Sequence, residues 1–157
     1  MSGQPEKEPD VECLEVTDAT PSRSLKIDEL KLGQAVFEKV VFDSDRLSHF
    51  AKVANDRAPV HNDPRFARTV GFEKPIIQGL ALSTRFSRLI GMYLPGERAV
   101  LEKIELKYRA PVFAGSALIY QCKVVRVMRP LNVVQLGLSI TVDGREHVSG
   151  QCQCVLR

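Results

Sequence analysis

The sequence predicts an α+β domain in which an antiparallel sheet wraps around one long helix. Three observations lead to this fold class. Residues 78–92 are apolar around most of a helical circumference, which is typical of a buried helix. The second half of the chain alternates apolar and polar residues, which is the period of half-buried strands. Asp143-Gly144 is a strong two-residue hairpin signal. Because the helices precede a run of strands instead of alternating with them, we expect one layered domain.

The chain from 25 to 77 predicts a strand, a helix, a loop and a short second helix. Residues 36–42 are a run of β-branched and aromatic residues, as in a strand. Ser44 is expected to cap a helix that ends near Asn55, since the apolar residues between them have helical spacing. Turn formers then predict a polar loop. Asp63-Pro64 predicts the N-cap and first residue of a short helix through Thr69.

Four antiparallel strands are expected after the buried helix, which Leu94-Pro-Gly ends. The expected strands are residues 104–108, 117–127, 134–142 and 146–156. The sequence contains no GxGxxG fingerprint after a strand, no P-loop and no HExxH, so it gives no sign of the familiar nucleotide and zinc sites.

The length of 157 residues is that of one domain, and 44% hydrophobic with 26% charged residues is an ordinary globular composition. The most apolar region, residues 76–92, is interrupted by Gln78, Arg85 and Arg88. It is therefore not a membrane span, and we expect no membrane partner.

Charge divides the chain at residue 24. Residues 1–24 have a net charge of −4 and are rich in Pro, and the rest of the chain carries +7. We therefore expect a flexible acidic arm over 1–24 and a folded domain over 25–157, and deletion of the arm is expected to leave stability and turnover unchanged. The basic excess fits an anionic partner, and scattered surface residues explain it equally well.

A cytoplasmic location is expected, because the first residues lack the apolar stretch of a secretory signal and are too acidic for a mitochondrial transit peptide. The four cysteines, Cys13, Cys122, Cys152 and Cys154, are then expected to be reduced and buried. No CxxC pair or histidine cluster accompanies them, so no metal site and no cofactor is predicted.

The candidate chemistry begins with Asp56 and His61, which lie five residues apart in a loop stiffened by Pro59. A carboxylate and an imidazole that hold one water molecule can exchange protons with a substrate. The same spacing also fits an Asx turn at Asp56 and a histidine bonded to the backbone.

The second candidate element is Gln78-Gly79 at the start of the buried helix. The amide groups of a helix N-terminus can hold a developing oxyanion, and glycine lets a ligand carbonyl approach them. Close packing of helix and sheet would require the same glycine. Ser83, one turn later, is a candidate ligand contact or a side chain bonded back to the Gly79 carbonyl.

Together these segments resemble a known family. The stretch PVHNDPRFARTVGFEKPIIQGLALSTRFSRLIG, then LPG and LKYRAPVFAG, is similar to the MaoC-like hot-dog (R)-specific enoyl-CoA hydratases and acyl dehydratases. The resemblance covers the chain from about Gly33 onward. It implies a hot-dog fold, an acyl-CoA or acyl-carrier thioester as substrate, and a homodimer; no nucleic-acid partner is expected.

The implied activity is that of a hydro-lyase of fatty acid metabolism, which adds water reversibly to a trans-2-enoyl thioester and gives an (R)-3-hydroxyacyl thioester. By the resemblance, Asp56, His61 and Gly79 are catalytic, and Ser83 and Gln78 contact the substrate. The water is held by Asp56 and His61, and the Gly79 amide polarises the thioester carbonyl. Which of the two side chains makes which proton transfer stays open at this point.

Two departures from the family pattern keep an alternative open. Many hydratases have Asn where this chain has Ala58 and His where it has Gln78. A non-catalytic module that binds an acyl thioester is therefore the second hypothesis. Thioester hydrolysis is the third and is disfavoured, since hot-dog thioesterases generally place a carboxylate on or near the central helix and residues 78–92 contain none.

Overall fold

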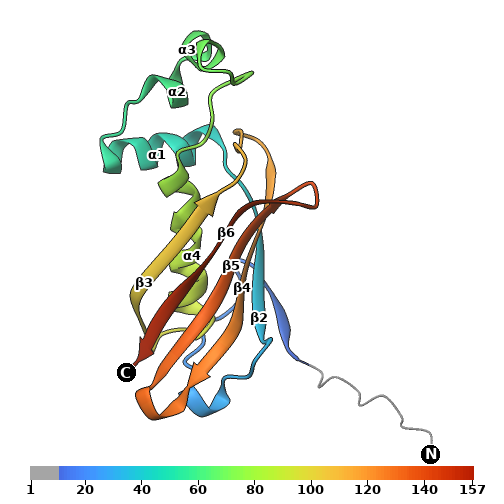
Figure 1. The fold of residues 1–157 in the computed structure, drawn as a ribbon, viewed down its shortest axis with the longest axis vertical. Helices are drawn as coiled ribbons and strands as arrows, with labels where there is room; N and C mark the ends of the chain where they lie inside the picture. The colour runs from blue at the N-terminus through green and yellow to red at the C-terminus, as the bar shows by residue number, and fades with distance from the viewer. Residues whose placement is uncertain (1–10) are drawn as a thin grey trace, which may run out of the picture.

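The computed structural model describes residues 11–157, and it confirms the predicted long helix wrapped by one sheet (Figure 1). The helices are α1 (Ser44–Ala54), α2 (Pro59–Asn62), α3 (Pro64–Thr69) and α4 (Gly79–Met92). The strands are β1 (Cys13–Val16), β2 (Ala35–Val41), β3 (Ala99–Tyr108), β4 (Ala117–Met128), β5 (Val133–Val142) and β6 (Arg145–Leu156). Short 3-10 turns occupy Ile27–Glu29 and Arg129–Leu131.

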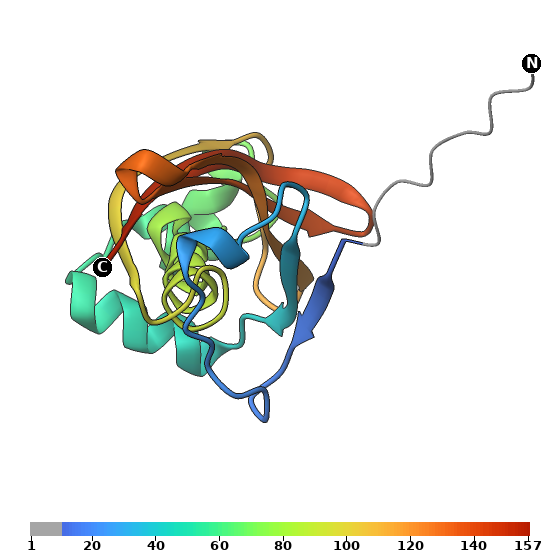
Figure 2. The same cartoon turned by 90° about the horizontal axis from the view of Figure 1, so that it is seen from below.

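The sheet has six strands in the order β1-β2-β4-β5-β6-β3. Every neighbouring pair is antiparallel except β1 and β2, which run parallel. Seen from below, the strands curve around α4 (Figure 2). The short helices α2 and α3 gather with α1 beyond one end of the sheet (Figure 1).

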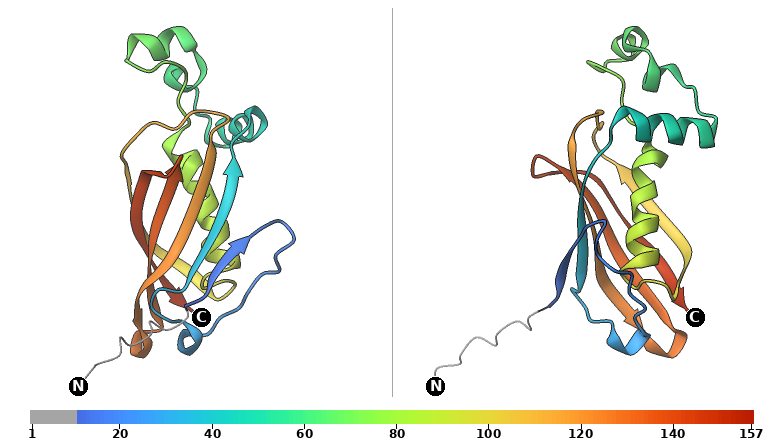
Figure 3. Two further views of the ribbon diagram at one scale, coloured as in Figure 1. Left: turned by 90° about the vertical axis from the view of Figure 1, so that its right-hand side faces the viewer. Right: turned by 180° about the vertical axis from the view of Figure 1, so that it is seen from behind.

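The apolar face of α4 provides one side of the core. Five of its residues are buried, namely Ala81, Leu82, Phe86, Leu89 and Ile90. Phe86 meets Tyr120 of β4 edge to face, with ring centroids 5.4 Å apart, an arrangement that aromatic pairs prefer. Burial raises the pKa of the Tyr120 hydroxyl above its usual value. The helix is therefore fixed against the sheet by apolar packing, and its N-terminus is held at the end where α1 crosses it (Figure 3, right).

The strand pattern of the second half is confirmed. From Val134 onward, buried and partly exposed residues alternate along β5, as the sequence indicates. Asp143 and Gly144 have φ angles of 48° and 74°, so both adopt the left-handed conformation that a type I′ hairpin turn requires. The turn therefore fixes the register between β5 and β6.

Two local expectations in the first half are corrected. Asp43, not Ser44, caps α1, because the Asp43 carboxylate accepts a hydrogen bond of 2.9 Å from the Arg46 amide. The expected polar loop also contains the one-turn helix α2, which begins at Pro59 because proline needs no amide partner in a first turn. The short helix with Asp63 as N-cap is confirmed.

The expectation of a flexible arm over 1–24 is wrong for residues 11–24; residues 1–10 lie outside the described part of the chain. β1 adds a parallel strand to the free edge of β2, where it satisfies backbone groups that would otherwise face water (Figure 3, left). Val16 is buried in the core. Nη1 and Nη2 of Arg23 each donate to the Glu12 carboxylate at 3.0 Å, which lowers the pKa of that carboxyl group. Tertiary contacts therefore order a segment whose composition alone favours disorder.

A charged cluster joins this segment to α4. Glu38 of β2 is only 4% exposed and forms ion pairs with Arg85 and with Arg88, the latter at 3.3 Å. Arg88 also donates to the carbonyl of Thr17 at 3.1 Å and pairs with Asp18 at 3.2 Å. One arginine therefore links the N-terminal segment, the helix and the sheet.

Three of the four cysteines are buried as expected, but Cys13 on β1 is exposed. Burial raises the pKa of the Cys122 thiol, so this group is held in its protonated form. Among the described residues, no helix combines the length and the apolar character needed to cross a bilayer.

Candidate active site

The segment between α1 and α4 carries the two side chains that the sequence singles out as acid and base. α1 ends at Asn55, whose φ of 50° turns the chain sharply. The next residue, Asp56, accepts a hydrogen bond of 3.0 Å from the Ala58 amide through Oδ1. This is the Asx turn that the sequence also allows. It fixes the carboxylate so that its second oxygen, Oδ2, faces His61.

His61 lies in the single turn of α2 and is oriented by a backbone carbonyl. Its Nδ1 lies 2.8 Å from the oxygen of Ile76. A carbonyl only accepts, so Nδ1 carries the hydrogen, and Nε2 of the neutral ring has the free lone pair. Nε2 lies 4.0 Å from Asp56 Oδ2, and the two side chains are 15% and 33% exposed. This separation is too long for a direct hydrogen bond, and a water molecule between the two atoms can bond to both.

His61 lies at the junction of two cavities. The first, of about 520 Å³, is bounded by α1 and includes Arg57, Gln78 and Lys52 in its lining. The second, of about 380 Å³, lies between the start of α4 and the end of β3. Apolar side chains such as Ile76 and Leu82 make up most of the second lining. The imidazole therefore borders a polar space on one side and a mostly apolar space on the other.

Gly79 is the first residue of α4 and also lines the apolar cavity. The first amides of a helix have no partner within it, so they are available to an acceptor in the cavity. A Cβ atom at Gly79 would lie 3.1 Å from two carbons of the Tyr108 ring. Close helix–sheet packing therefore favours glycine here, because the Tyr108 ring would have to move by a few tenths of an ångström to admit a side chain. The same lack of a side chain keeps the helix end open. Gln78 is buried and lines the polar cavity instead.

Ser83 makes two hydrogen bonds, one to the first residue of its own helix and one to Tyr108 at the end of β3. Its hydroxyl donates to the carbonyl oxygen of Gly79 at 3.0 Å, the local bond that the sequence permits. Ser83 has one hydrogen, so the contact of 2.6 Å with the Tyr108 hydroxyl is a bond in which Tyr108 donates. Tyr108 is the site residue that the sequence analysis did not single out. Its position in the motif LKYRAPVFAG was the available signal.

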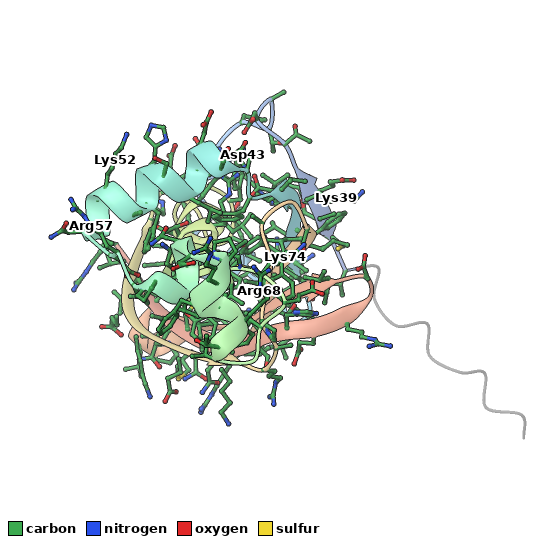
Figure 4. The ribbon with its side chains drawn as sticks, turned by 90° about the horizontal axis from the view of Figure 1, so that it is seen from above. Lys39, Asp43, Lys52, Arg57, Arg68 and Lys74 are labelled. Atoms are coloured by element: carbon green, nitrogen blue, oxygen red, sulfur yellow. The ribbon has the colours of Figure 1, made fainter. Side chains whose placement is uncertain are left out.

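Cations occupy the face above these cavities. In the view from above, Lys52 and Arg57 lie toward one side, near the end of α1, and Arg68 and Lys74 lie nearer the centre (Figure 4). Lys52 and Arg57 are the two that also line the polar cavity. Within residues 11–157, no group of three or more His, Cys, Asp and Glu side chains is arranged to hold a metal ion.

With this geometry established, the chain was compared with known proteins. The model of the MaoC like domain family matches residues 18–142, which is most of the chain and includes the whole candidate site. The chain belongs to the MaoC-like domain family. The matched range also includes the end of the N-terminal segment that the structure places against the sheet.

This MaoC-like chain is similar to curated proteins that include hydratases and dehydratases. The (R)-specific enoyl-CoA hydratase of Aeromonas caviae is 31% identical over 115 residues, which cover 73% of this chain and 86% of the relative. The mitochondrial 3-hydroxyacyl-[acyl-carrier-protein] dehydratase of Arabidopsis thaliana is 37% identical over 90 residues, which cover 57% of this chain and 53% of the relative.

Solved structures of MaoC-like proteins confirm the hot-dog fold. The (R)-hydratase of A. caviae, described as involved in PHA biosynthesis, superposes with a TM-score of 0.77 at 30% identity and covers 82% of this chain and 98% of its own. The unliganded R-hydratase PhaJ1 from Pseudomonas aeruginosa gives 0.78 at 25% identity, over 87% and 88% of the two chains.

Proposed function

We propose that this protein is a hydro-lyase that adds water reversibly to a trans-2-enoyl thioester and forms an (R)-3-hydroxyacyl thioester. The observation that carries the proposal is the pair formed by His61 and Asp56. Nε2 of His61 and Oδ2 of Asp56 lie 4.0 Å apart, next to a cavity that the N-terminus of α4 also borders. The names of the relatives, enoyl-CoA hydratase and 3-hydroxyacyl dehydratase, agree with it.

In the hydration direction, the water molecule lies between Asp56 and His61. Asp56 accepts one hydrogen bond from it and holds it in place. Nε2 of His61 removes the other proton as the water oxygen bonds to C3 of the substrate. The electron pair of the double bond moves to the thioester oxygen, and the proton on Nε2 then passes to C2. One water molecule is thus added, and the imidazole is neutral again.

The negative charge that develops on the thioester oxygen needs a fixed donor. The Gly79 amide begins α4, so it combines a free N–H group with the positive end of a helix dipole. A donor already in position stabilises such an oxyanion without reorganisation. Its place in the same cavity lining as His61 supports a substrate whose carbonyl and C3 lie a few atoms apart.

The two cavities fit the two ends of such a substrate. The acyl group fits the mostly apolar cavity of about 380 Å³. The polar arm that leads to the phosphates of coenzyme A, or of a carrier protein, fits the cavity of about 520 Å³ with Lys52 and Arg57. Gln78, which lines that cavity, would contact the arm, and Ser83 would support the helix end.

We also propose that the working form is a homodimer in the cytoplasm. β3 lies at one edge of the sheet and exposes Val100, Leu101 and Ile104, a long apolar edge that a second copy would cover. The buried thiols of Cys122, Cys152 and Cys154 fit a reducing compartment. Acyl thioesters of this kind belong to fatty acid metabolism.

The test uses the purified chain and crotonyl-CoA. Hydration removes the absorbance of the conjugated enoyl thioester and releases no thiol, and the product is the (R)-3-hydroxy isomer. Release of free thiol would instead indicate a thioesterase. If the absorbance stays constant and no thiol is released, while crotonyl-CoA still binds, the proposal is replaced by a non-catalytic acyl-thioester-binding module.

A further inference from the structure

We propose that the ring of Tyr108 is the wall that ends the acyl site, so that this protein selects short acyl chains. The inference rests on the proposed function and adds a specificity-determining residue to it. Tyr108 is the last residue of β3, and it lines the cavity of about 380 Å³ together with His61 and Gly79.

The ring of Tyr108 lies directly over the first turn of α4. Two of its carbons would be 3.1 Å from a Cβ atom at Gly79, so the ring packs on the backbone of the residue proposed to hold the thioester oxygen. Its hydroxyl reaches Ser83, one turn further along the helix, at 2.6 Å. The side chain therefore spans the helix surface from Gly79 to Ser83.

Hydrogen bonds hold the ring in this place. Tyr108 donates to Ser83, and Ser83 donates to the Gly79 carbonyl, so that the ring is fixed at its far end by the helix it covers. Its backbone is fixed by the pairing of Tyr108 with Val148 of β6. A side chain fixed at both ends does not swing aside readily for a longer ligand.

This position determines which substrates fit. An acyl chain that has its carbonyl at Gly79 and extends along α4 meets the ring within one helical turn. A mostly apolar pocket discriminates by roughly 10-fold or more for each methylene that it rejects. A four-carbon enoyl group has only one carbon beyond C3 and fits beside the ring on this proposal, whereas an eight-carbon group has to displace it.

The test compares kcat/KM for crotonyl-CoA and trans-2-octenoyl-CoA. The natural chain is expected to prefer crotonyl-CoA by at least roughly 10-fold, and Tyr108→Ala is expected to raise the octenoyl-to-crotonyl ratio by at least roughly 10-fold. Tyr108→Phe keeps the ring and loses only its bond to Ser83, so its ratio is expected to stay closer to that of the natural chain than to that of Tyr108→Ala. Circular dichroism establishes that each variant is folded, and Tyr108→Leu, which keeps an apolar side chain, replaces Tyr108→Ala if the latter is not.

The matched control is Ile119→Ala, which removes a comparably exposed apolar side chain from β4 of the same sheet and should leave the ratio unchanged. An unchanged ratio in the folded Tyr108 variant, or a natural chain that prefers octenoyl-CoA, would overturn the specificity role while hydration itself stands. A natural chain that hydrates neither substrate would instead overturn the proposed function.

Discussion

The Nδ1 atom of His61 and the carbonyl oxygen of Ile76 lie 2.8 Å apart, which ties the imidazole on α2 to the segment that leads into α4. The Ile76 amide also donates to the carbonyl of Val60 on α2 at 3.3 Å, so the same segment is joined to α2 twice. The bond from Nδ1 selects the tautomer with its lone pair on Nε2, and it places that lone pair between Asp56 and the opening of the helix.

The first prediction concerns the two proton-handling groups. Asp56→Asn and His61→Ala are each expected to lower kcat by at least roughly 10²-fold with little change in KM, the scale of lost acid–base catalysis. Because both side chains hold one water molecule, the double variant should be hardly slower than the slower single variant. Steady-state kinetics with crotonyl-CoA measures all three.

The matched control for His61 is His49→Ala, since His49 also donates through Nδ1 to a backbone carbonyl, that of Asp45 at 2.7 Å, but is exposed on α1. It should retain the natural kcat. A folded His61→Ala protein with near-normal turnover would contradict the mechanism.

The second prediction concerns the N-terminal segment. Deletion of residues 1–24 is expected to lower the free energy of unfolding by at least about 2 kcal/mol, the scale of burying one valine such as Val16, because β1 and its contacts to Arg88 are lost. Thermal unfolding at one protein concentration measures the difference. Deletion of residues 1–10 alone removes none of these contacts and is the control. Equal midpoints for the two deletions would show that β1 contributes nothing.

The third prediction concerns the buried carboxylate of Glu38. Glu38→Gln leaves Arg85 and Arg88 without their shared counter-ion, and it is expected to lower the free energy of unfolding by about 3 kcal/mol, the scale of breaking a buried ion pair. Urea unfolding measures this loss. Glu105→Gln, which removes the exposed pair with Lys103, should change stability by less than about 1 kcal/mol. Equal losses of unfolding free energy in the two variants would show that the burial of Glu38 does not strengthen its ion pairs.

The fourth prediction concerns the edge of the sheet. Light scattering is expected to give the dimer mass for the natural chain, and Leu101→Asp with Ile104→Asp is expected to shift it to the monomer mass, because two carboxylates on each copy would be buried against one another. Val53→Asp, on exposed α1, is the control and should remain dimeric. A natural chain of monomer mass at all working concentrations would contradict the dimer.

Local signals in the sequence account for the elements that could be predicted. Strict alternation in β5 and the turn residues Asp143-Gly144 act over a few residues, so the pattern is visible without the fold. β1 could not be predicted, because its four residues have no strong pattern of their own and are ordered by pairing with the edge of β2.

In the candidate site too, some residues could be predicted from the sequence and others could not. Asp56, His61 and Gly79 could be selected because they lie in motifs that resemble those of the MaoC-like family, and Asp63 is a recognisable cap. In the sequence, Tyr108 is one more apolar residue of an alternating strand, since its role depends on α4 lying against it, a contact between residues 25 positions apart. The 4.0 Å gap between His61 and Asp56 likewise depends on how the turn folds.

The pairing of β1 with β2 also bears on how many copies can join. β1 is only four residues long, and a short edge strand is a poor template for another chain. Within residues 11–157, the long open edge of the sheet is therefore that of the ten-residue β3 at the other side. If two copies pair through β3, as proposed, each covers this edge of the other, and assembly would stop at a pair instead of growing into a fibre.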